Sequence, residues 1–266
     1  MFLRNLVLWA ASLPVLFAAD PHFNIPLWEP GKVPMALGDG PLDAPFLTVF
    51  RPTGKPNGSA VVIAPGGSNI MLMYNLEGVD IAERFNDWGT TAFVLTYRLS
   101  PRYNEAARAL DGNRAMRIVR SRAKEFGIDP ERISFAGFSA GSSMARNVAA
   151  TATSGDPSAA DPIDRLPSKA HSLVMVYSAG RPQPGEKLAE FPPVFLLAAA
   201  HDRGAANGSA QLFLDMNKAG TVVELHLYQR GRHGFGAATT SPEYGPWMDQ
   251  LKHFLNLNKF FGGSSK

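Results

Sequence analysis

Short runs of apolar and β-branched residues recur along the chain and alternate with longer segments in which apolar residues follow helical spacing. The runs cover residues 46–50, 60–64, 91–97, 133–136, 172–177, 194–200 and 222–228, and the helical segments cover residues 79–88, 106–126, 142–150 and 210–219. Several runs are almost continuously apolar, which is typical of strands that are covered on both faces. The alternation predicts a mostly parallel central β-sheet flanked by helices, an α/β fold.

One predicted helix carries both an apolar stripe and the densest run of basic residues. We interpret the basic run, residues 114–124, as a solvated helix face rather than a nucleic-acid site, because the other basic residues are dispersed and the formal net charge is only +3. Gly127 then ends the helix. The stripe predicts core packing for Leu110, Ala115, Ile118, Val119, Ala123 and Phe126.

The composition describes a globular protein that buries a substantial core. Hydrophobic residues make up 45% of the chain and charged residues 18%. Loops are expected at residues 151–168 and 181–193, and neither is long enough for a separate lid domain. Asn57 and Asn207 begin glycosylation sequons, but each precedes a glycine, and we interpret both as turns.

The first residues have the pattern of a secretory leader. Arg4 precedes an apolar stretch over residues 6–17, and two small residues then offer a cleavage point. This predicts a signal peptide over residues 1–19, one α/β domain over residues 20–266, and a secreted or periplasmic location without stable membrane insertion. An uncleaved anchor is the alternative. The chain contains no cysteine, which excludes disulfides, thiolate metal sites and a cysteine nucleophile.

Ser139 lies at the centre of Gly137-Phe138-Ser139-Ala140-Gly141, between a predicted strand and a predicted helix. A serine hydroxyl is an effective nucleophile when a sharp turn holds it clear of the backbone, and flanking glycines permit such a turn. The pattern predicts a nucleophile elbow at Ser139. Because glycine is abundant in this chain, the motif also needs partners elsewhere.

A nucleophilic serine requires a base to take its proton and a carboxylate to orient that base. Asp202 follows the strand 194–200 almost directly, at the sheet edge where catalytic groups gather. The alternative is that Asp202 only orders the turn into the next helix. His233 lies in a glycine-rich loop after the strand 222–228, and His201 is its one serious rival. We therefore predict Asp202 as the acid and His233 as the base.

Backbone N–H groups are expected to stabilise the oxyanion of the reaction. Ala140 follows the nucleophile directly and supplies one such group, and Gly66 and Gly67 follow an early strand and offer the second. An ordinary Pro-Gly-Gly turn is the alternative for the two glycines. Met71, Met73 and Tyr74 come next and either line the substrate pocket or pack in the core, whereas Trp247 is expected to be a core residue.

Several separated motifs together resemble α/β-hydrolase esterases related to acetylxylan and feruloyl esterases, often described as lipase-like or xylanase-associated esterases. The resemblance runs from about residue 25 to residue 255 and implies an α/β-hydrolase fold in which Ser139, Asp202 and His233 form a triad. It also implies an oxyanion hole at Gly66, Gly67 and Ala140. The motifs are Pro65-Gly66-Gly67, Glu77-Gly78, Tyr97-Arg98-Leu99, Arg120-Ser121-Arg122-Ala123, the Ser139 elbow and Gly231-Arg232-His233-Gly234-Phe235-Gly236.

Two positions depart from the pattern of these relatives. Ser68 stands where a further glycine is usual, and Ser142-Ser143 stand where Gly-His is common. Both departures concern residues beside the expected chemistry, so we include Ser68 and Ser142 among the candidate substrate-binding residues.

The sequence thus predicts a secreted serine esterase for short-chain acyl esters, with acetyl groups on plant polysaccharide as the candidate substrate. No metal or cofactor is implied, and neither is a nucleic-acid partner. A peptidase or lipase of the same fold remains an alternative, because one triad serves several acyl transfers. So does a catalytically silent, carbohydrate-binding relative.

Overall fold

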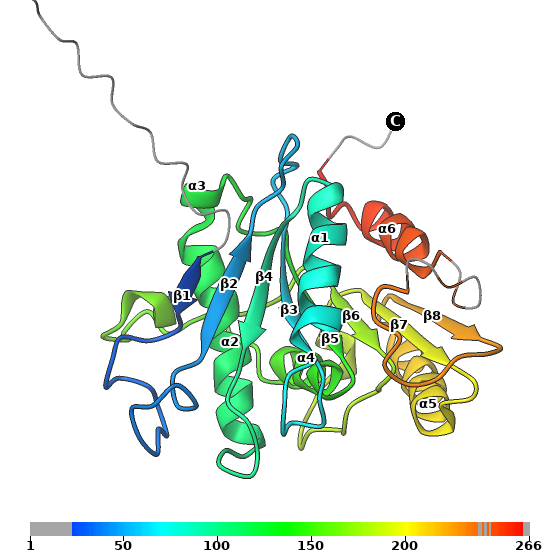
Figure 1. Ribbon diagram of the computed structural model, residues 1–266, viewed down its shortest axis with the longest axis horizontal. Helices are drawn as coiled ribbons and strands as arrows, with labels where there is room; N and C mark the ends of the chain where they lie inside the picture. The colour runs from blue at the N-terminus through cyan, green and yellow to red at the C-terminus, as the bar shows by residue number, and fades with distance from the viewer. Residues whose placement is uncertain (1–22, 239–240, 242–243, 245, 263–266) are drawn as a thin grey trace, which may run out of the picture.

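A twisted central sheet runs through the computed structural model, which describes residues 23–238, 241, 244 and 246–262 (Figure 1). The described strands lie in the order β1-β2-β4-β3-β5-β6-β7-β8. Strand β2 is antiparallel to both of its neighbours, and the other pairs are parallel. The strands are β1 (Asn24–Pro26), β2 (Phe46–Phe50), β3 (Ala60–Ala64), β4 (Thr91–Thr96), β5 (Ile133–Phe138), β6 (Leu173–Val176), β7 (Val194–Ala199) and β8 (Val223–Tyr228).

The predicted strands are therefore confirmed as β2 to β8, within two residues at each end. Strand β1 was not predicted, because three residues are too few to show a period. The predicted signal peptide, residues 1–19, lies outside the described residues and stays a prediction. No helix in the described part of the chain is both long and apolar enough to cross a membrane.

The four predicted helices are all present. The helix predicted over residues 106–126 is interrupted, the one predicted over residues 210–219 begins earlier than expected, and α6 was not predicted. The helices are α1 (Asp80–Asp87), α2 (Glu105–Ser121), α3 (Ala123–Phe126), α4 (Ala140–Ala150), α5 (Arg203–Ala219) and α6 (Trp247–Leu257), with a π-helical turn η1 (Asn75–Val79) and 3-10 turns η2 (Pro162–Arg165) and η3 (Leu188–Glu190). Asn207 lies inside α5, so its interpretation as a turn was wrong. The Asn57 side chain does hold a turn, because its Oδ1 accepts from the Ser59 N–H at 2.7 Å.

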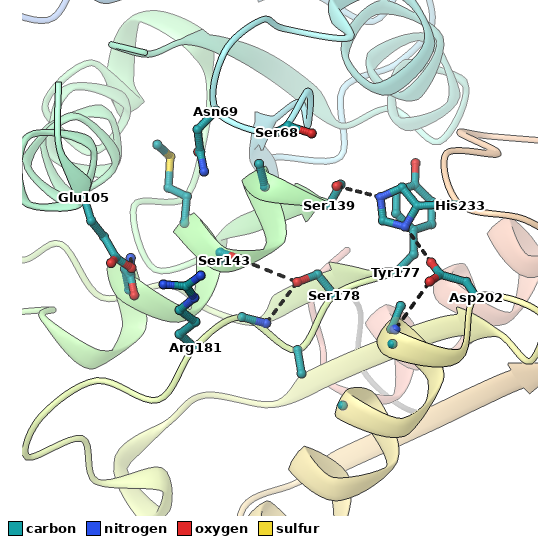
Figure 2. Close-up of a pocket in the computed structure, with 18 of the residues that line it drawn as sticks. Ser68, Asn69, Glu105, Ser139, Ser143, Tyr177, Ser178, Arg181, Asp202 and His233 are labelled. Atoms are coloured by element: carbon teal, nitrogen blue, oxygen red, sulfur yellow. Dashed lines mark hydrogen bonds and ion pairs between the residues drawn. The ribbon is translucent and has the colours of Figure 1, made fainter. Parts of the chain in front are cut away.

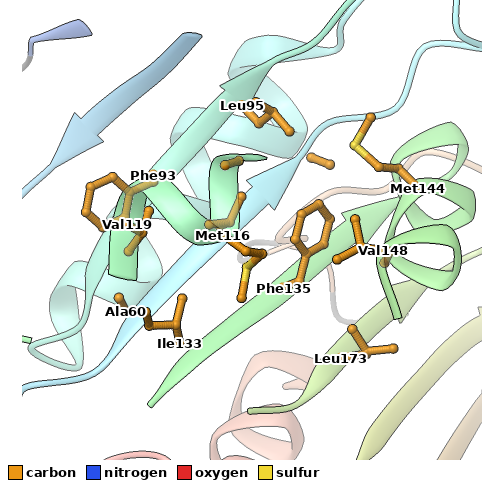
Figure 3. Close-up of a cluster of buried hydrophobic side chains, with 14 of the residues drawn as sticks. Ala60, Phe93, Leu95, Met116, Val119, Ile133, Phe135, Met144, Val148 and Leu173 are labelled. Carbon is orange, nitrogen blue, oxygen red and sulfur yellow. The ribbon is translucent and has the colours of Figure 1, made fainter. Parts of the chain in front are cut away.

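Alternate residues of the buried strands supply two hydrophobic cores, one on each face of the sheet. Val62 belongs to the first core together with residues of α2, α4 and α5, whereas Val61 and Ile63 belong to the second together with residues of α1 and α6. Figure 3 shows Met116 of α2 and Val148 of α4 lying over the sheet in the first core. Trp247 is fully buried in the second core, as expected. Each such side chain contributes about 1.5–3 kcal/mol, and the two layers fix the sheet edge on which the site is built.

The apolar stripe of α2 was predicted correctly except at Leu110, which is 40% exposed. Leu110 precedes Ala115 by five residues, which places it about 140° away around a helix of 3.6 residues per turn. Ala115, Ile118 and Val119 are buried in the first core. The stripe therefore begins later than the sequence interpretation placed it.

The interpretation of residues 114–124 as a solvated face was wrong for Arg114 and Arg120, although it holds for Lys124, which is exposed. Arg114 and Arg120 are only 5% and 8% exposed. Arg114 pairs with Asp161 and Asp164 at 2.5 and 2.8 Å, and Arg120 donates to the carbonyls of Pro167 and, at 2.8 Å, Lys169. These arginines tie the loop 151–168 to α2, because their long side chains reach acceptors while their stems pack on the helix.

Candidate active site

Loops that follow the carboxyl ends of parallel strands meet at one edge of the sheet. Such an edge is where open α/β sheets bind their ligands. The loops carry Gly66 after β3, Ser139 after β5, Tyr177 after β6, Asp202 after β7 and His233 after β8.

Ser139 occupies a strained turn between β5 and α4. Its φ is 53° and its ψ is −113°, an unfavourable backbone conformation for a residue with a side chain. The glycines on either side permit close packing: a Cβ on Gly137 would lie 2.1 Å from the Gly141 carbonyl oxygen, and one on Gly141 would lie 1.9 Å from that of Ala64. The turn therefore has the geometry of a nucleophile elbow.

Ser139, His233 and Asp202 form one continuous chain of hydrogen bonds (Figure 2). The Nδ1 of His233 lies 2.5 Å from Asp202 Oδ2, and its Nε2 lies 2.7 Å from Ser139 Oγ. A carboxylate beside Nδ1 favours the tautomer with its proton there, which leaves Nε2 to accept from the serine hydroxyl. The three side chains predicted from the sequence thus meet, while the rival His201 lies exposed in the turn after β7.

Asp202 also begins α5. Its Oδ1 accepts the Ala205 N–H at 3.4 Å, and this bond caps the helix while Oδ2 faces His233. The two sequence interpretations of Asp202, catalytic acid and turn residue, therefore describe two oxygens of one carboxylate.

Tyr177 is a residue of this site that sequence reasoning missed. Its ring centroid lies 4.9 Å from that of His233, and its side chain is almost fully buried. Burial and the nearby Glu77 carboxylate raise the pKa of Tyr177 well above its ordinary value, so the phenol keeps its proton. The terminal tyrosine of an apolar strand looks like ordinary core, and nothing local distinguishes it.

The expected oxyanion hole needs one correction. The Gly66 N–H donates to Glu77 Oε2 at 2.7 Å, so it does not face the site as a free donor. Gly67 donates its N–H to no other described residue, and its carbonyl accepts from Ile70 and Met71, each at 3.1 Å. Ala140 is the first residue of α4, where helix N–H groups have no partner within the helix. The geometry favours Gly67 and Ala140 as the two donors.

An open cavity of about 640 Å³ begins at Ser139 and His233 and extends toward α2. Ser68 lines it as expected, but Ser142, Met71 and Tyr74 do not. Ser142 is fully buried and donates to the Ser178 carbonyl at 2.5 Å, and the Tyr74 hydroxyl donates to Thr48 Oγ1 at 2.6 Å. Met71 is 54% exposed beyond Gly67. These three predictions of substrate contact are corrected: the turn after Gly67 directs Met71 and Tyr74 away from the cavity, and Ser142 is buried in α4.

The wall of the cavity beyond the elbow is polar. Figure 2 shows Glu105, Asn69 and Arg181 on the side of Ser139 opposite His233. Glu105 Oε1 accepts from the Asn147 amide at 2.7 Å. These residues come from four separate segments of the chain, so no sequence motif identifies them as parts of one site. Within the described residues, no group of three or more histidine, aspartate or glutamate side chains is placed to hold a metal ion.

Comparison with known proteins agrees with this geometry. A family described as having the alpha/beta hydrolase fold matches residues 64–178, which include the elbow. An acetylxylan esterase from Xylanibacter ruminicola is 25% identical over 278 aligned positions, which cover 96% of this chain and 54% of the relative. The chain thus spans about half the length of that protein.

Solved structures extend the likeness to three dimensions. An acetyl ester-xyloside bifunctional hydrolase from Caldicellulosiruptor lactoaceticus matches with a TM-score of 0.82 and 28% identity, over 90% of this chain and 97% of that one. A butyrate-bound esterase from Thermogutta terrifontis matches with a TM-score of 0.66 and 19% identity, over 83% and 92% of the two chains, a likeness of fold alone. The chain has the alpha/beta hydrolase fold, its described residues form no large domain beyond it, and it resembles acetylxylan esterases.

Proposed function

We propose that this protein is a secreted serine esterase that removes short acyl groups, acetyl above all, from hydroxyl-rich alcohols such as plant polysaccharide. The observation that carries the proposal is the hydrogen-bonded chain from Asp202 through His233 to Ser139 at the mouth of an open cavity. The likeness to an acetylxylan esterase and to an acetyl ester-xyloside hydrolase supports the same chemistry.

In the first half of the reaction, Ser139 Oγ attacks the ester carbonyl while His233 Nε2 takes its proton. Asp202 holds the imidazole and stabilises its positive charge. The carbonyl oxygen becomes an oxyanion that Gly67 and Ala140 N–H groups stabilise. His233 then returns the proton to the departing alcohol, which leaves an acyl group on Ser139.

In the second half, water replaces the alcohol. His233 takes a proton from the water, which attacks the acyl-enzyme and releases the acid, and the proton returns to Ser139 Oγ. His233 has a half-exposed side chain, which is consistent with ready access of water. The sequence of two acyl transfers predicts ping-pong kinetics.

The polar cavity supports a hydroxyl-rich substrate. Glu105 and Asn69 carry amide or carboxylate oxygens that accept hydrogen bonds from hydroxyl groups, and Arg181 supplies donors. A long acyl chain would offer none of these groups a hydrogen-bond partner. The predicted leader over residues 1–19 supports action outside the cytoplasm, where such polymers occur.

The test is hydrolysis of p-nitrophenyl acetate by the purified protein and by Ser139→Ala, together with labelling by a fluorophosphonate probe. We expect turnover and labelling at Ser139 in the wild type and neither in the variant. Wild-type rates in Ser139→Ala would refute the assignment, and a silent relative would show neither turnover nor labelling in the wild type. Preference for long-chain esters or for peptide amides would indicate the lipase or the peptidase alternative.

A further inference from the structure

Glu77 is a buried carboxylate beside the site that the mechanism above does not use. It lies in η1, is 2% exposed, and forms no ion pair within the described part of the chain. Its Oε2 accepts the Gly66 N–H at 2.7 Å, and its Oε1 accepts the Tyr177 hydroxyl at 2.5 Å. Burial of a carboxylate is costly unless its oxygens are hydrogen-bonded, so this arrangement is strongly specified by its two donors.

One of these donors belongs to the oxyanion loop. A Cβ added to Gly66 would lie 2.7 Å from both Glu77 Oε2 and Ser139 Cβ. Gly66 is therefore packed directly between the Glu77 carboxylate and the Ser139 side chain. The Gly66 carbonyl accepts the Met73 N–H at 2.9 Å, and the Met73 carbonyl accepts the Glu77 N–H at 2.9 Å. These bonds fasten the segment 66–73 to η1 and set the direction of the Gly67 N–H.

The other donor supports the catalytic base. The Tyr177 ring packs against His233 with 4.9 Å between centroids, and its hydroxyl accepts the Gly236 N–H at 3.4 Å. Gly236 lies in the loop that carries His233. Tyr177 therefore contacts both the imidazole and its loop, while its proton is donated to Glu77.

We propose that Glu77 is a positioning residue that connects the oxyanion loop to the catalytic histidine: one oxygen fixes the Pro65–Gly66 peptide, which directly precedes the Gly67 N–H, and the other fixes Tyr177 beneath His233. The inference rests on the proposed esterase function. It explains why the Gly66 N–H donates to Glu77 and not to the substrate: this bond orients the loop so that the neighbouring Gly67 N–H faces the oxyanion. Oxyanion donors act only when preorganised at about 2.7–3.1 Å from the developing charge.

The test is Glu77→Gln, which keeps the shape of the side chain but replaces one acceptor oxygen with an NH2 group. Either Gly66 or Tyr177 then faces a donor instead of an acceptor. We expect kcat for p-nitrophenyl acetate to fall by roughly 10²-fold, the loss typical of one oxyanion donor, with KM changed by less than about 2-fold. The affinity for a boronic acid, which mimics the tetrahedral state, should fall in the same proportion as kcat.

Tyr177→Phe provides a second variant that removes one hydroxyl and preserves packing. We expect an intermediate loss of kcat, about 10-fold, and a double variant whose loss is smaller than the product of the two, because the residues act through one another. Tyr103→Phe is the matched control, because its buried hydroxyl also donates to a carboxylate, that of Asp43. It should lower thermal stability without changing kcat.

The outcomes separate the inference from the function. An active wild type with kcat and boronic acid affinity unchanged within about 2-fold in both folded variants would overturn the role of Glu77 and leave the esterase assignment intact. If Glu77→Gln does not fold, unchanged kcat and boronic acid affinity in Tyr177→Phe alone would overturn the role of Glu77. A wild type that neither hydrolyses esters nor reacts with a fluorophosphonate would overturn both.

Discussion

Asp202 holds the imidazole of His233 with one carboxylate oxygen and the first turn of α5 with the other, at 2.5 Å and 3.4 Å. A single side chain therefore links the proposed catalytic base to a helix of 17 residues. Because the two bonds use different oxygens, substitutions can separate their contributions.

Asp202→Asn should lower kcat by roughly 10⁴-fold, because an amide beside Nδ1 favours the wrong imidazole tautomer. Asparagine is an equally good helix cap, so thermal stability should change little. Asp202→Ala should lose both the activity and about 1 kcal/mol of stability.

The control for the cap is Asn104→Ala, since Asn104 caps α2 by accepting the Ala107 N–H at 3.1 Å. It should show the stability loss alone. Steady-state kinetics and urea unfolding measure the two effects, and full activity in Asp202→Asn would contradict the assigned role.

Gly67→Ala should reduce kcat by at least about 10-fold. Gly67 has φ of 126°, and an added Cβ would lie 2.3 Å from the Met71 carbonyl oxygen, so the loop must move. Loss of an aligned oxyanion donor costs more than 10²-fold when complete. Gly31→Ala is the matched control, because Gly31 also has a positive φ, of 75°, but lies in open space. Equal kcat in the two variants, measured with p-nitrophenyl acetate, would argue against the Gly67 donor.

Glu105→Ala should reduce kcat/KM for an acetylated xylo-oligosaccharide by about 10-fold or more, as expected for a hydrogen bond to a charged group. Hydrolysis of p-nitrophenyl acetate should stay within about 2-fold, because that substrate has no hydroxyl groups to bind. Glu125→Ala, on the far end of α3, serves as the control. A parallel loss on both substrates would show that Glu105 supports the fold rather than the polar wall of the cavity.

Asp111→Ala should destabilise the protein by about 3–5 kcal/mol, the cost of leaving a buried charge unpaired. Asp111 and Arg98 both have fully buried side chains and lie 2.7 Å apart. In contrast, Glu190→Ala should cost less than about 1 kcal/mol, because its pair with Lys187 is exposed. Urea unfolding measures both, and similar losses would contradict the difference in burial.

The strand pattern and the meeting of Ser139, Asp202 and His233 were predictable from the sequence because both depend on local order. Continuous apolar runs such as residues 194–199 are typical of strands covered on both faces, and the elbow around Ser139 is a short-range steric requirement. Asp202 and His233 were identified because each follows a strand, and the carboxyl ends of parallel strands meet at one edge. The start of α5 was missed because its first turn has no apolar stripe, only a capping carboxylate.

By itself, the sequence determined the sheet, the elbow and the order of the three reactive side chains. Only the tertiary structure decided which groups face the substrate. In the folded chain the Gly66 N–H donates to Glu77, Ser142 is buried, and the Tyr74 hydroxyl donates to Thr48. The polar wall around Glu105 is formed by segments that are distant in the sequence. The physical reason is that a hydrogen-bonding group has no fixed role until packing selects its partner, whereas the periodicity of a strand or the sterics of a glycine turn acts within a few residues.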